Sequence, residues 1–443
     1  MNEKYNLLAF SGLTLFSFYY AYDLPGMLNY SLKFKDSTNK EMKIGLLYTA
    51  YVLPNIILPF FISNYAKCKQ HKAVFLLSLI ALSGQLLFTS GVYLESFAVM
   101  IIGRIVFGIG CESFLTFQNK TIVESFKLKE ISTAMSIFNI CGRLGTILNF
   151  LLTPVVAQYT NASVACSVGC LLICFSTRNA YFNYKKYTNF GEPEIDQNLG
   201  QEPEISQDQH ELHQNDNKIE YNNFSSNALP QSNLIDIKYE IVSENKTMVK
   251  NFHSSFKLLA ITCFLYAMIW TPYYNIAPMI YQKKYKMTKK SSGRILSLLE
   301  IISMISSLVT APVIDKCGMN LSLLIVGAIL LGLSHVCVLL SDHSQYTSIL
   351  FLGISAACFS STWSFVPRLV AKKYTTLAFS ILTCATNLAI AASSILFSYV
   401  AFKDDSFRSI EISLIGLSLL LFFIVSLLHY QNAKPTNSLD EPE

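Results

Sequence analysis

The chain has little charge for its length. Of its 443 residues only 14% are Asp, Glu, Lys or Arg, 52% are hydrophobic, and the mean hydropathy is +0.38. A soluble domain carries about 25% charged residues. Uncharged runs such as residues 73–94 and 144–177 are long enough for helices that cross a bilayer. The composition therefore excludes a soluble protein and predicts an all-α membrane protein.

The sequence also lacks the motifs of common enzymes and of ATP-driven pumps. It contains no HExxH, GxSxG or CxxC motif and no GxxxxGKS/T phosphate loop. The spacing of Cys166, Cys170 and Cys174 on one helix face is more typical of close helix packing than of metal ligands. We therefore expect a protein that is not an enzyme, with no cofactor and no metal site.

Acidic and basic residues are unevenly distributed along the chain. Residues 183–252 hold 12 of the 29 acidic residues but only 6 of the 34 basic ones, so the rest of the chain is basic. Because these positive charges are scattered over short loops, they indicate contact with anionic lipid headgroups and no nucleic-acid partner. Segment 183–252 is rich in Gln, Asn and Ser, which predicts a disordered acidic linker in the cytosol.

Twelve apolar segments surround this linker, six on each side, as expected for a transporter built from two similar halves. The predicted spans are 5–30, 44–66, 73–94, 97–119, 131–158 and 162–182, then 256–281, 292–314, 319–341, 346–370, 376–402 and 410–430. The predicted domains are an N-terminal six-helix bundle (1–182), the linker (183–252), a C-terminal six-helix bundle (253–431) and a cytosolic tail (432–443).

The short loops after spans two, four and ten are rich in Lys and Arg, which places them and both termini in the cytosol. The loops after spans one and seven are also basic although they lie on the opposite side. These two loops oppose the assignment, unless they form a basic external vestibule.

An ionisable side chain inside a span is a functional candidate, because burying it in lipid is costly. The candidates are Asp23, Arg104, Glu112, Arg143 and Glu300. Arg104 lies near the end of its span, where extension toward the headgroups or pairing with Asp23 explains it as well as transport does.

Glu112 and Arg143 lie well inside consecutive spans, and two interpretations compete for them. One is a structural salt bridge or gate; the other is a clamp in which the carboxylate binds an ammonium and the guanidinium binds a carboxylate. Asn139, Arg143 and Thr146 share one helical face, which favours an aqueous cavity beside Arg143.

Proline interrupts the first span of each half. Asp23 precedes Pro25 and Gly26, and Pro272 and Pro278 occupy the corresponding part of span seven. Paired interruptions in matching helices are typical of a binding site near the bilayer midplane, although a simple kink also accounts for them.

Two motifs carry a resemblance to a known family. The loop from Pro312 to Gly318, with Asp315 and Lys316, resembles a signature loop of the major facilitator superfamily. In that family the carboxylate caps a helix and the loop forms a cytosolic latch, which here would comprise Asp315, Lys316 and Gly318. The first-half counterpart departs from the pattern, because Asn64 replaces the usual Asp.

The run from Gly103 to Ser113 in span four resembles the lysosomal dipeptide transporter branch of this superfamily, as do segments of spans one, two, five, ten and eleven. The resemblance implies passive uniport of dipeptides by alternating access across a lysosomal or vacuolar membrane. Glu112 and Arg143 would contact substrate, and Asp23, Trp363 and Asn387 would line the same cavity. It also implies a glycosylated accessory membrane subunit as a partner, and a homodimer stays open.

Two alternatives remain at this level. One is a proton-coupled or antiporting carrier for another small solute. The other is a non-transporting membrane receptor or scaffold that signals through the acidic linker. Retention of function after deletion of residues 183–252 would favour a carrier.

Overall fold

The computed structural model describes residues 3–29, 31–33, 39–59, 70–190, 253–340, 345–370, 374–403 and 406–432. Every regular element in these ranges is a helix, which confirms the all-α class. Ten of the described helices are long and apolar enough to cross a membrane. The other two predicted spans correspond to α1 (Glu3–Tyr22), and to α3 (Lys40–Val52) followed by the 3-10 helix η1 (Leu53–Ile56).

The helices follow the order that the apolar segments predict. The first half continues with α5 (Gln70–Tyr93), α6 (Phe97–Ser125), η2 (Leu128–Glu130), α7 (Ile131–Tyr159) and α8 (Ala162–Phe190). The second half contains α10 (Ser254–Lys283), α11 (Lys289–Cys317), α12 (Asn320–Leu340), α13 (Gln345–Ser360), α14 (Thr362–Leu369), α15 (Thr375–Lys403) and α16 (Arg408–Asn432). Residues 183–190, assigned above to the linker, are therefore helical. Residues 191–252 and 433–443 lie outside the described ranges, and the two-bundle division stays a prediction.

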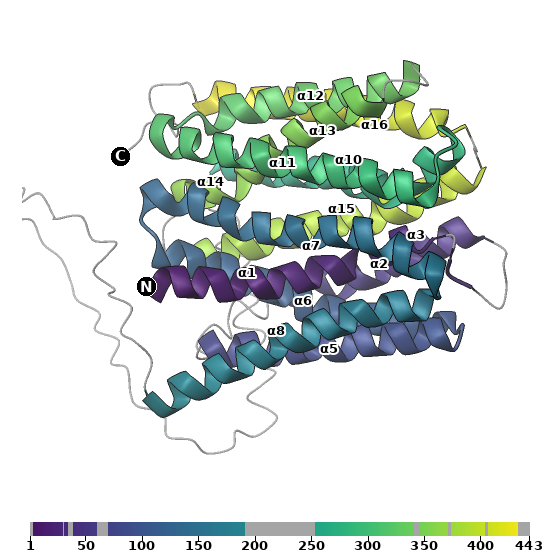
Figure 1. Ribbon diagram of the computed structural model, residues 1–443. Coiled ribbons are helices and arrows are strands. Elements are labelled where there is room, and N and C mark those ends of the chain that lie inside the picture. Colours follow the sequence, from purple (N-terminus) through teal and green to yellow (C-terminus); the bar gives the residue numbers. More distant parts are fainter. Residues whose placement is uncertain are drawn as a thin grey trace, which may run out of the picture. The chain divides into compact units, whose positions relative to one another are not determined.

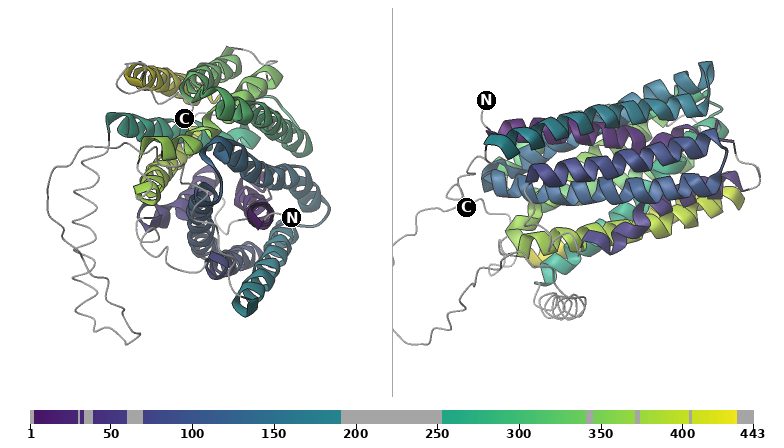
Figure 2. Two further views of the ribbon diagram at one scale, coloured as in Figure 1. Left: turned by 90° about the vertical axis from the view of Figure 1, so that its left-hand side faces the viewer. Right: turned by 90° about the horizontal axis from the view of Figure 1, so that it is seen from below.

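The long helices run side by side, and the start of α1 and the end of α16 lie at the same end of the helical body (Figures 1 and 2). At that end Lys4 of α1 forms an ion pair of 2.9 Å with Glu130 beside α7. The two halves meet along two helix pairs, α7 with α11 and α3 with α15. In the second pair, the Thr49 hydroxyl donates to the carbonyl of Ala391 at 3.2 Å.

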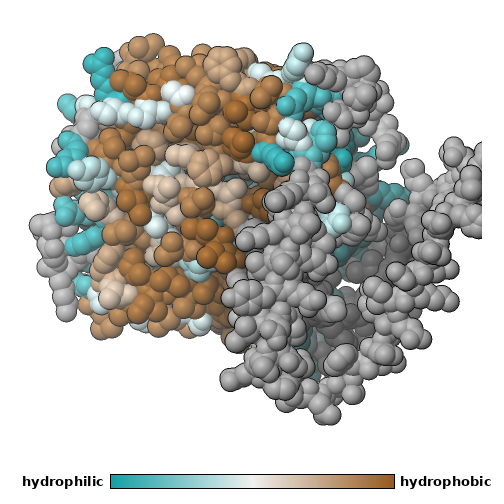
Figure 3. Space-filling view, turned by 180° about the vertical axis from the view of Figure 1, so that it is seen from behind, coloured by the Kyte–Doolittle hydropathy of each residue, from teal (hydrophilic) through white to brown (hydrophobic). Residues whose placement is uncertain are grey.

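Apolar side chains dominate the face of the molecule seen in Figure 3, with hydrophilic ones gathered toward the helix ends. Large hydrophobic residues are exposed on the described helices, among them Phe423, which is 65% exposed. A soluble protein rarely leaves such a continuous apolar surface uncovered. This distribution fits helices that are surrounded by lipid.

Glycine allows two helix pairs to approach closely enough to place side chains at the centre. A Cβ atom on Gly108 of α6 would lie 1.9 Å from the carbonyl oxygen of Tyr51 on α3. A Cβ atom on Gly145 of α7 would lie 2.0 Å from the carbonyl oxygen of Phe16 on α1. Small residues at such crossings are the usual way for membrane helices to pack backbone against backbone.

The helix breaks differ between the two halves. The first predicted interruption is present, because α1 ends at Tyr22 and the short α2 (Leu24–Met27) starts after Asp23. The interruption expected in span seven is not: α10 is one continuous helix, so the two halves are not symmetric here. Instead, span ten divides at Ser361 into α13 and α14.

Side-chain hydroxyls explain the unexpected break in span ten. Ser360, Ser361 and Thr362 donate to the backbone carbonyls of Ala356, Cys358 and Phe359, respectively, at 2.6 to 2.9 Å. Hydroxyl groups that bond to nearby carbonyls compete with the helical ladder and often bend a helix.

The second half contains a buried polar pair outside the centre. Nδ1 of His335 on α12 lies 2.9 Å from a carboxylate oxygen of Glu411 on α16, and both side chains are almost completely buried. The Tyr273 ring of α10 packs edge-on against His335 at 4.9 Å. The pair therefore connects three helices of this half.

We expect Glu411→Ala to lower the stability of the folded protein, because it leaves the buried His335 without its acceptor. Breaking a buried pair from one side costs about 3–5 kcal/mol. Thermal unfolding in detergent, followed by intrinsic fluorescence, measures the effect. Glu124→Ala is the control, since Glu124 is 54% exposed and faces Lys120 at 3.7 Å. Equal melting temperatures for the two variants would contradict the expectation.

Candidate functional site

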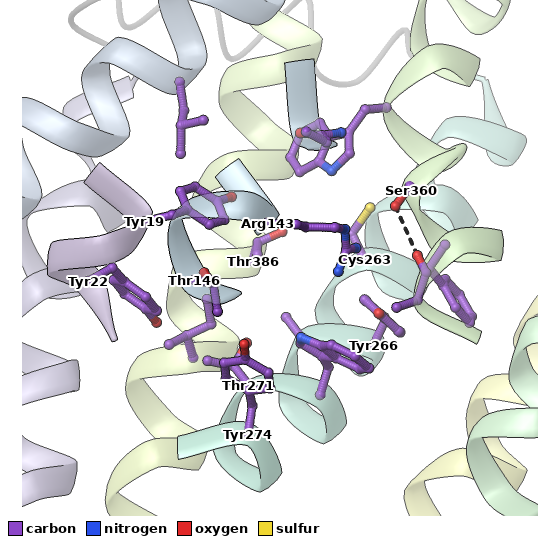
Figure 4. A pocket seen from close by; sticks show the side chains of 18 of the residues that line it. Tyr19, Tyr22, Arg143, Thr146, Cys263, Tyr266, Thr271, Tyr274, Ser360 and Thr386 are labelled. Atoms are coloured by element: carbon purple, nitrogen blue, oxygen red, sulfur yellow. Dashed lines mark hydrogen bonds between the residues drawn. The ribbon is translucent and has the colours of Figure 1, made fainter. Parts of the chain in front are cut away.

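A cavity of about 300 Å³ lies at the centre of the helices (Figure 4). Its lining comes from α1, α3, α6, α7, α10, α11, α13, α14 and α15, and therefore from both halves of the chain. A volume of about 300 Å³ is at the small end of the range for pockets that hold small molecules. The cavity can thus enclose a compact solute.

All five residues predicted to bind substrate line this cavity: Asp23, Glu112, Arg143, Trp363 and Asn387. They come from five different segments, so only the fold brings them together. Their contact with a substrate stays a prediction.

Arg143 is the one cation among the described residues that line the cavity, which three carboxylates also line, those of Asp23, Glu112 and Glu300. Its guanidinium Nη1 lies 2.8 Å from Oε2 of Glu300, and the two side chains are 15% and 4% exposed. This ion pair joins α7 of the first half to α11 of the second. Charge-assisted hydrogen bonds of this kind are among the strongest in proteins.

Glu112 has a different set of neighbours. The hydroxyl of Tyr51 donates to its Oε1 at 2.8 Å, and the amide of Asn387 also lies within reach of the carboxylate. The salt bridge between Glu112 and Arg143, one of the two interpretations above, is therefore not present in this structure. The reason is tertiary, because α11 brings Glu300 to Arg143.

Asp23 sits in the break between α1 and α2 and is 3% exposed. Its Oδ2 accepts a hydrogen bond of 2.8 Å from the Thr146 hydroxyl of α7. Arg104, offered above as its partner, instead donates to the carbonyls of Ala21 and Tyr22 at 3.4 and 3.1 Å. Asp23 is thus held by a neutral donor.

Arg104 is completely buried, and aromatic rings surround it. Its guanidinium carbon lies 5.0 to 5.7 Å from five ring centroids, those of Tyr22, Tyr48, Tyr51, Phe88 and Phe107. A cation near the last carbonyls of a helix stabilises the negative end of its dipole. Arg104 therefore fixes the end of α1, and with it the position of Asp23, without entering the cavity.

The two predicted residues of the second half lie close to helix boundaries or contacts. Trp363 follows the break between α13 and α14 and stacks on Phe379 with 6.2 Å between the centroids. The amide of Asn387 on α15 donates to the carbonyl of Asn55 in η1 at 3.3 Å, across the two halves.

An aromatic wall on α10 was missed by the reasoning from sequence. The wall consists of three rings of α10 and one ring of α13, Phe359, which stacks on Tyr266. From Phe359 through Tyr266 and Trp270 to Tyr274, the ring centroids are 4.1, 6.0 and 5.8 Å apart. Three of them, Tyr266, Trp270 and Tyr274, recur every four residues, which is a signal of one helical face. Tyr274 lines the cavity, whereas its neighbour Tyr273 packs against His335.

The last turn of α11 contacts the start of α7. The Asp315 carboxylate accepts hydrogen bonds from the backbone N–H groups of Ser132 and Thr133 at 3.2 and 2.9 Å, and from the Thr133 hydroxyl at 2.6 Å. It therefore caps the start of α7 from the other half of the chain. Gly318 ends α11 with a φ of 69°, and Lys316 is exposed. Asn64, the first-half counterpart, lies outside the described residues, and the latch function stays a prediction.

Helices around a central cavity with a buried ion pair between the halves are the architecture of a membrane carrier. The sequence profile of the Major Facilitator Superfamily matches residues 7–189 and 259–443. The chain belongs to this superfamily, and it is a multi-pass membrane transporter of small solutes rather than an enzyme.

Curated relatives of this chain include lysosomal dipeptide transporters named MFSD1. The one from Homo sapiens is 24% identical over 98% of this chain and 87% of its own length. Those from Mus musculus and Danio rerio are 23% and 24% identical, over 88% and 86% of this chain and 78% and 77% of their own lengths.

Solved structures with the same fold belong to transporters as well. The human organic anion transporter MFSD10 superposes with a TM-score of 0.69 at 14% identity, over 96% of this chain and all of the other. The proton:xylose symporter XylE superposes with a TM-score of 0.71 at 13% identity, over 99% and 98% of the two chains. At such identities the likeness establishes the fold alone.

We expect Asp315→Ala to destabilise the start of α7, because its N–H groups lose their acceptor. The loss of an N-cap costs about 0.5–2 kcal/mol. Thermal unfolding measures the change, with Asp315→Asn expected to fall between the wild type and Asp315→Ala. Cys317→Ala, two residues away and exposed, is the control. An Asp315→Ala protein as stable as that control would refute the cap's contribution.

Proposed function

We propose that this carrier transports dipeptides or related small zwitterions by uniport, through alternating access to the central cavity. The observation that carries the proposal is a cavity of about 300 Å³ whose described lining combines the single guanidinium of Arg143 with three carboxylates and several aromatic rings. A zwitterion has one ammonium and one carboxylate. A cavity that offers an acceptor for the first and a cationic donor for the second offsets the cost of removing both from water.

Arg143 is the group proposed to bind the substrate carboxylate. A planar guanidinium can hold a carboxylate with two parallel hydrogen bonds. Glu112 and Asp23 are the acceptors proposed for the ammonium, since the hydroxyl groups of Tyr51 and Thr146 that donate to them are neutral. Trp363 and the aromatic wall of α10 would contact the remainder of the solute, and flat apolar surfaces tolerate different side chains.

The names of the MFSD1 relatives support both the dipeptide and a lysosomal or vacuolar membrane. The basic loops support cytosolic termini. A closing latch at Asp315, Lys316 and Gly318, a glycosylated accessory subunit and a homodimer stay predictions of the family resemblance.

We expect Arg143→Ala to reduce the uptake of tritiated dialanine into proteoliposomes at least about tenfold at low substrate concentration, since a hydrogen bond to a charged group contributes about 1.5–3 kcal/mol. Arg143→Lys keeps the charge but not the planar donor pair, so its uptake should be intermediate. Arg178→Ala is the matched control, because Arg178 is exposed on α8. Size-exclusion chromatography checks that each variant is folded. Wild-type uptake by Arg143→Ala would rule out the clamp.

Blocking either charged end of the peptide should weaken binding. We expect N-acetyl-dialanine and dialanine amide to compete with tritiated dialanine at concentrations about tenfold higher or more, because each leaves one charged group of the cavity without a partner. Competition by the amide equal to that of unmodified dialanine would show that Arg143 does not bind the carboxylate.

The uniport mechanism has its own test. With equal dialanine on both sides of the proteoliposome membrane, an imposed pH gradient should drive no accumulation, because a uniporter moves solute only down its own gradient. Accumulation would favour the proton-coupled alternative.

A further inference from the structure

The ion pair between Arg143 and Glu300 occupies the group that the proposed function needs for substrate. Nη1 of Arg143 bonds to Oε2 of Glu300 at 2.8 Å, and both residues line the cavity. The Glu300 side chain is only 4% exposed, and the Tyr274 hydroxyl also lies against it. A carboxylate of the protein itself is therefore already paired with the guanidinium.

The other two carboxylates of the cavity are engaged elsewhere. Asp23 accepts from Thr146, and Glu112 accepts from Tyr51. Neither forms an ion pair with Arg143 in the described structure, so Glu300 alone neutralises the guanidinium there.

A buried guanidinium without a counter-ion is costly, because its desolvation is then not offset. A carrier that works by uniport must also change between its two open forms while empty. During that step the cavity closes around Arg143 with no substrate present. The charge of Arg143 needs an internal partner at that moment, and Glu300 is in place to provide it.

We propose that Glu300 is the internal stand-in for the substrate carboxylate. It neutralises Arg143 in the empty carrier, and the carboxylate of an entering solute displaces it. This inference rests on the proposed function, and it assigns Glu300 to the return of the empty carrier rather than to substrate contact. Because α7 and α11 come from different halves, displacement of Glu300 by a solute also removes an ion pair between the two halves.

The proposal separates two modes of transport. Net uptake requires the empty carrier to return, whereas exchange of labelled for unlabelled solute requires only the loaded carrier to move. Removal of the Glu300 charge should therefore impair the first mode and spare the second. It should also strengthen substrate binding, because the internal competitor for Arg143 is lost.

The experiment compares wild type, Glu300→Gln and Asp23→Asn in proteoliposomes. Net uptake of tritiated dialanine is measured into empty vesicles, and exchange is measured into vesicles loaded with unlabelled dialanine. For Glu300→Gln we expect net uptake to fall about tenfold or more and exchange to stay within about threefold of wild type, since the variant leaves a buried cation unpaired only in the empty carrier. Asp23→Asn removes a cavity carboxylate that is not bonded to Arg143, so its two modes should fall together.

A second pair of variants guards against a folding defect in Glu300→Gln. Glu300→Asp and Glu300→Asn have side chains of equal size and differ in charge. The ratio of net uptake to exchange should stay near the wild-type value in the first and fall in the second. A dialanine titration of thermal stability should give tighter binding for the neutral variant, because ligand binding raises apparent stability.

Equal losses of net uptake and exchange in folded Glu300→Gln would overturn the proposal and make the ion pair a purely structural bridge. Unchanged values in both modes would overturn it as well. If wild-type protein neither binds dialanine nor moves it in either mode, the proposed function fails instead, so the two failures are distinguishable.

Discussion

A guanidinium inside a membrane protein must find acceptors, and the two buried arginines of this carrier find them in different ways. Arg104 donates to the last carbonyls of α1 and is enclosed by aromatic rings, so its charge is used within the scaffold. Arg143 pairs with a carboxylate across the cavity, where a solute can compete for it. Arg104 thus holds the helix end next to Asp23, whereas Arg143 is placed to take part in binding.

The geometry of the cavity depends on close helix approach as much as on charge. Gly108 brings α6 against α3, which lets the Tyr51 hydroxyl reach Glu112 on α6. Gly145 brings α7 against α1, which lets Thr146 reach Asp23. A larger side chain at either glycine would separate a carboxylate from its donor, so packing and electrostatics are not independent here.

The two halves are similar in helix order but differ in how they line the cavity. The first half supplies the cation, two carboxylates and a broken helix at Asp23. The second half supplies one carboxylate, a continuous α10 with its aromatic stack, and a break before Trp363. The cation and most of the carboxylates thus come from one half and the aromatic stack from the other, which suits a solute with charged ends and a variable apolar part.

The sequence by itself determined the membrane class, the succession of helices and the few residues whose charge is buried, because hydropathy and spacing depend only on neighbours along the chain. It also placed Asp23, Glu112, Arg143, Trp363 and Asn387 among the residues of interest, partly through a family resemblance. It did not determine their partners. Arg143 binds Glu300 rather than Glu112, Arg104 binds carbonyls rather than Asp23, and the helix break of the second half lies in span ten rather than in span seven. Those choices depend on which helices pack together and at what depth, and only the tertiary structure decides that.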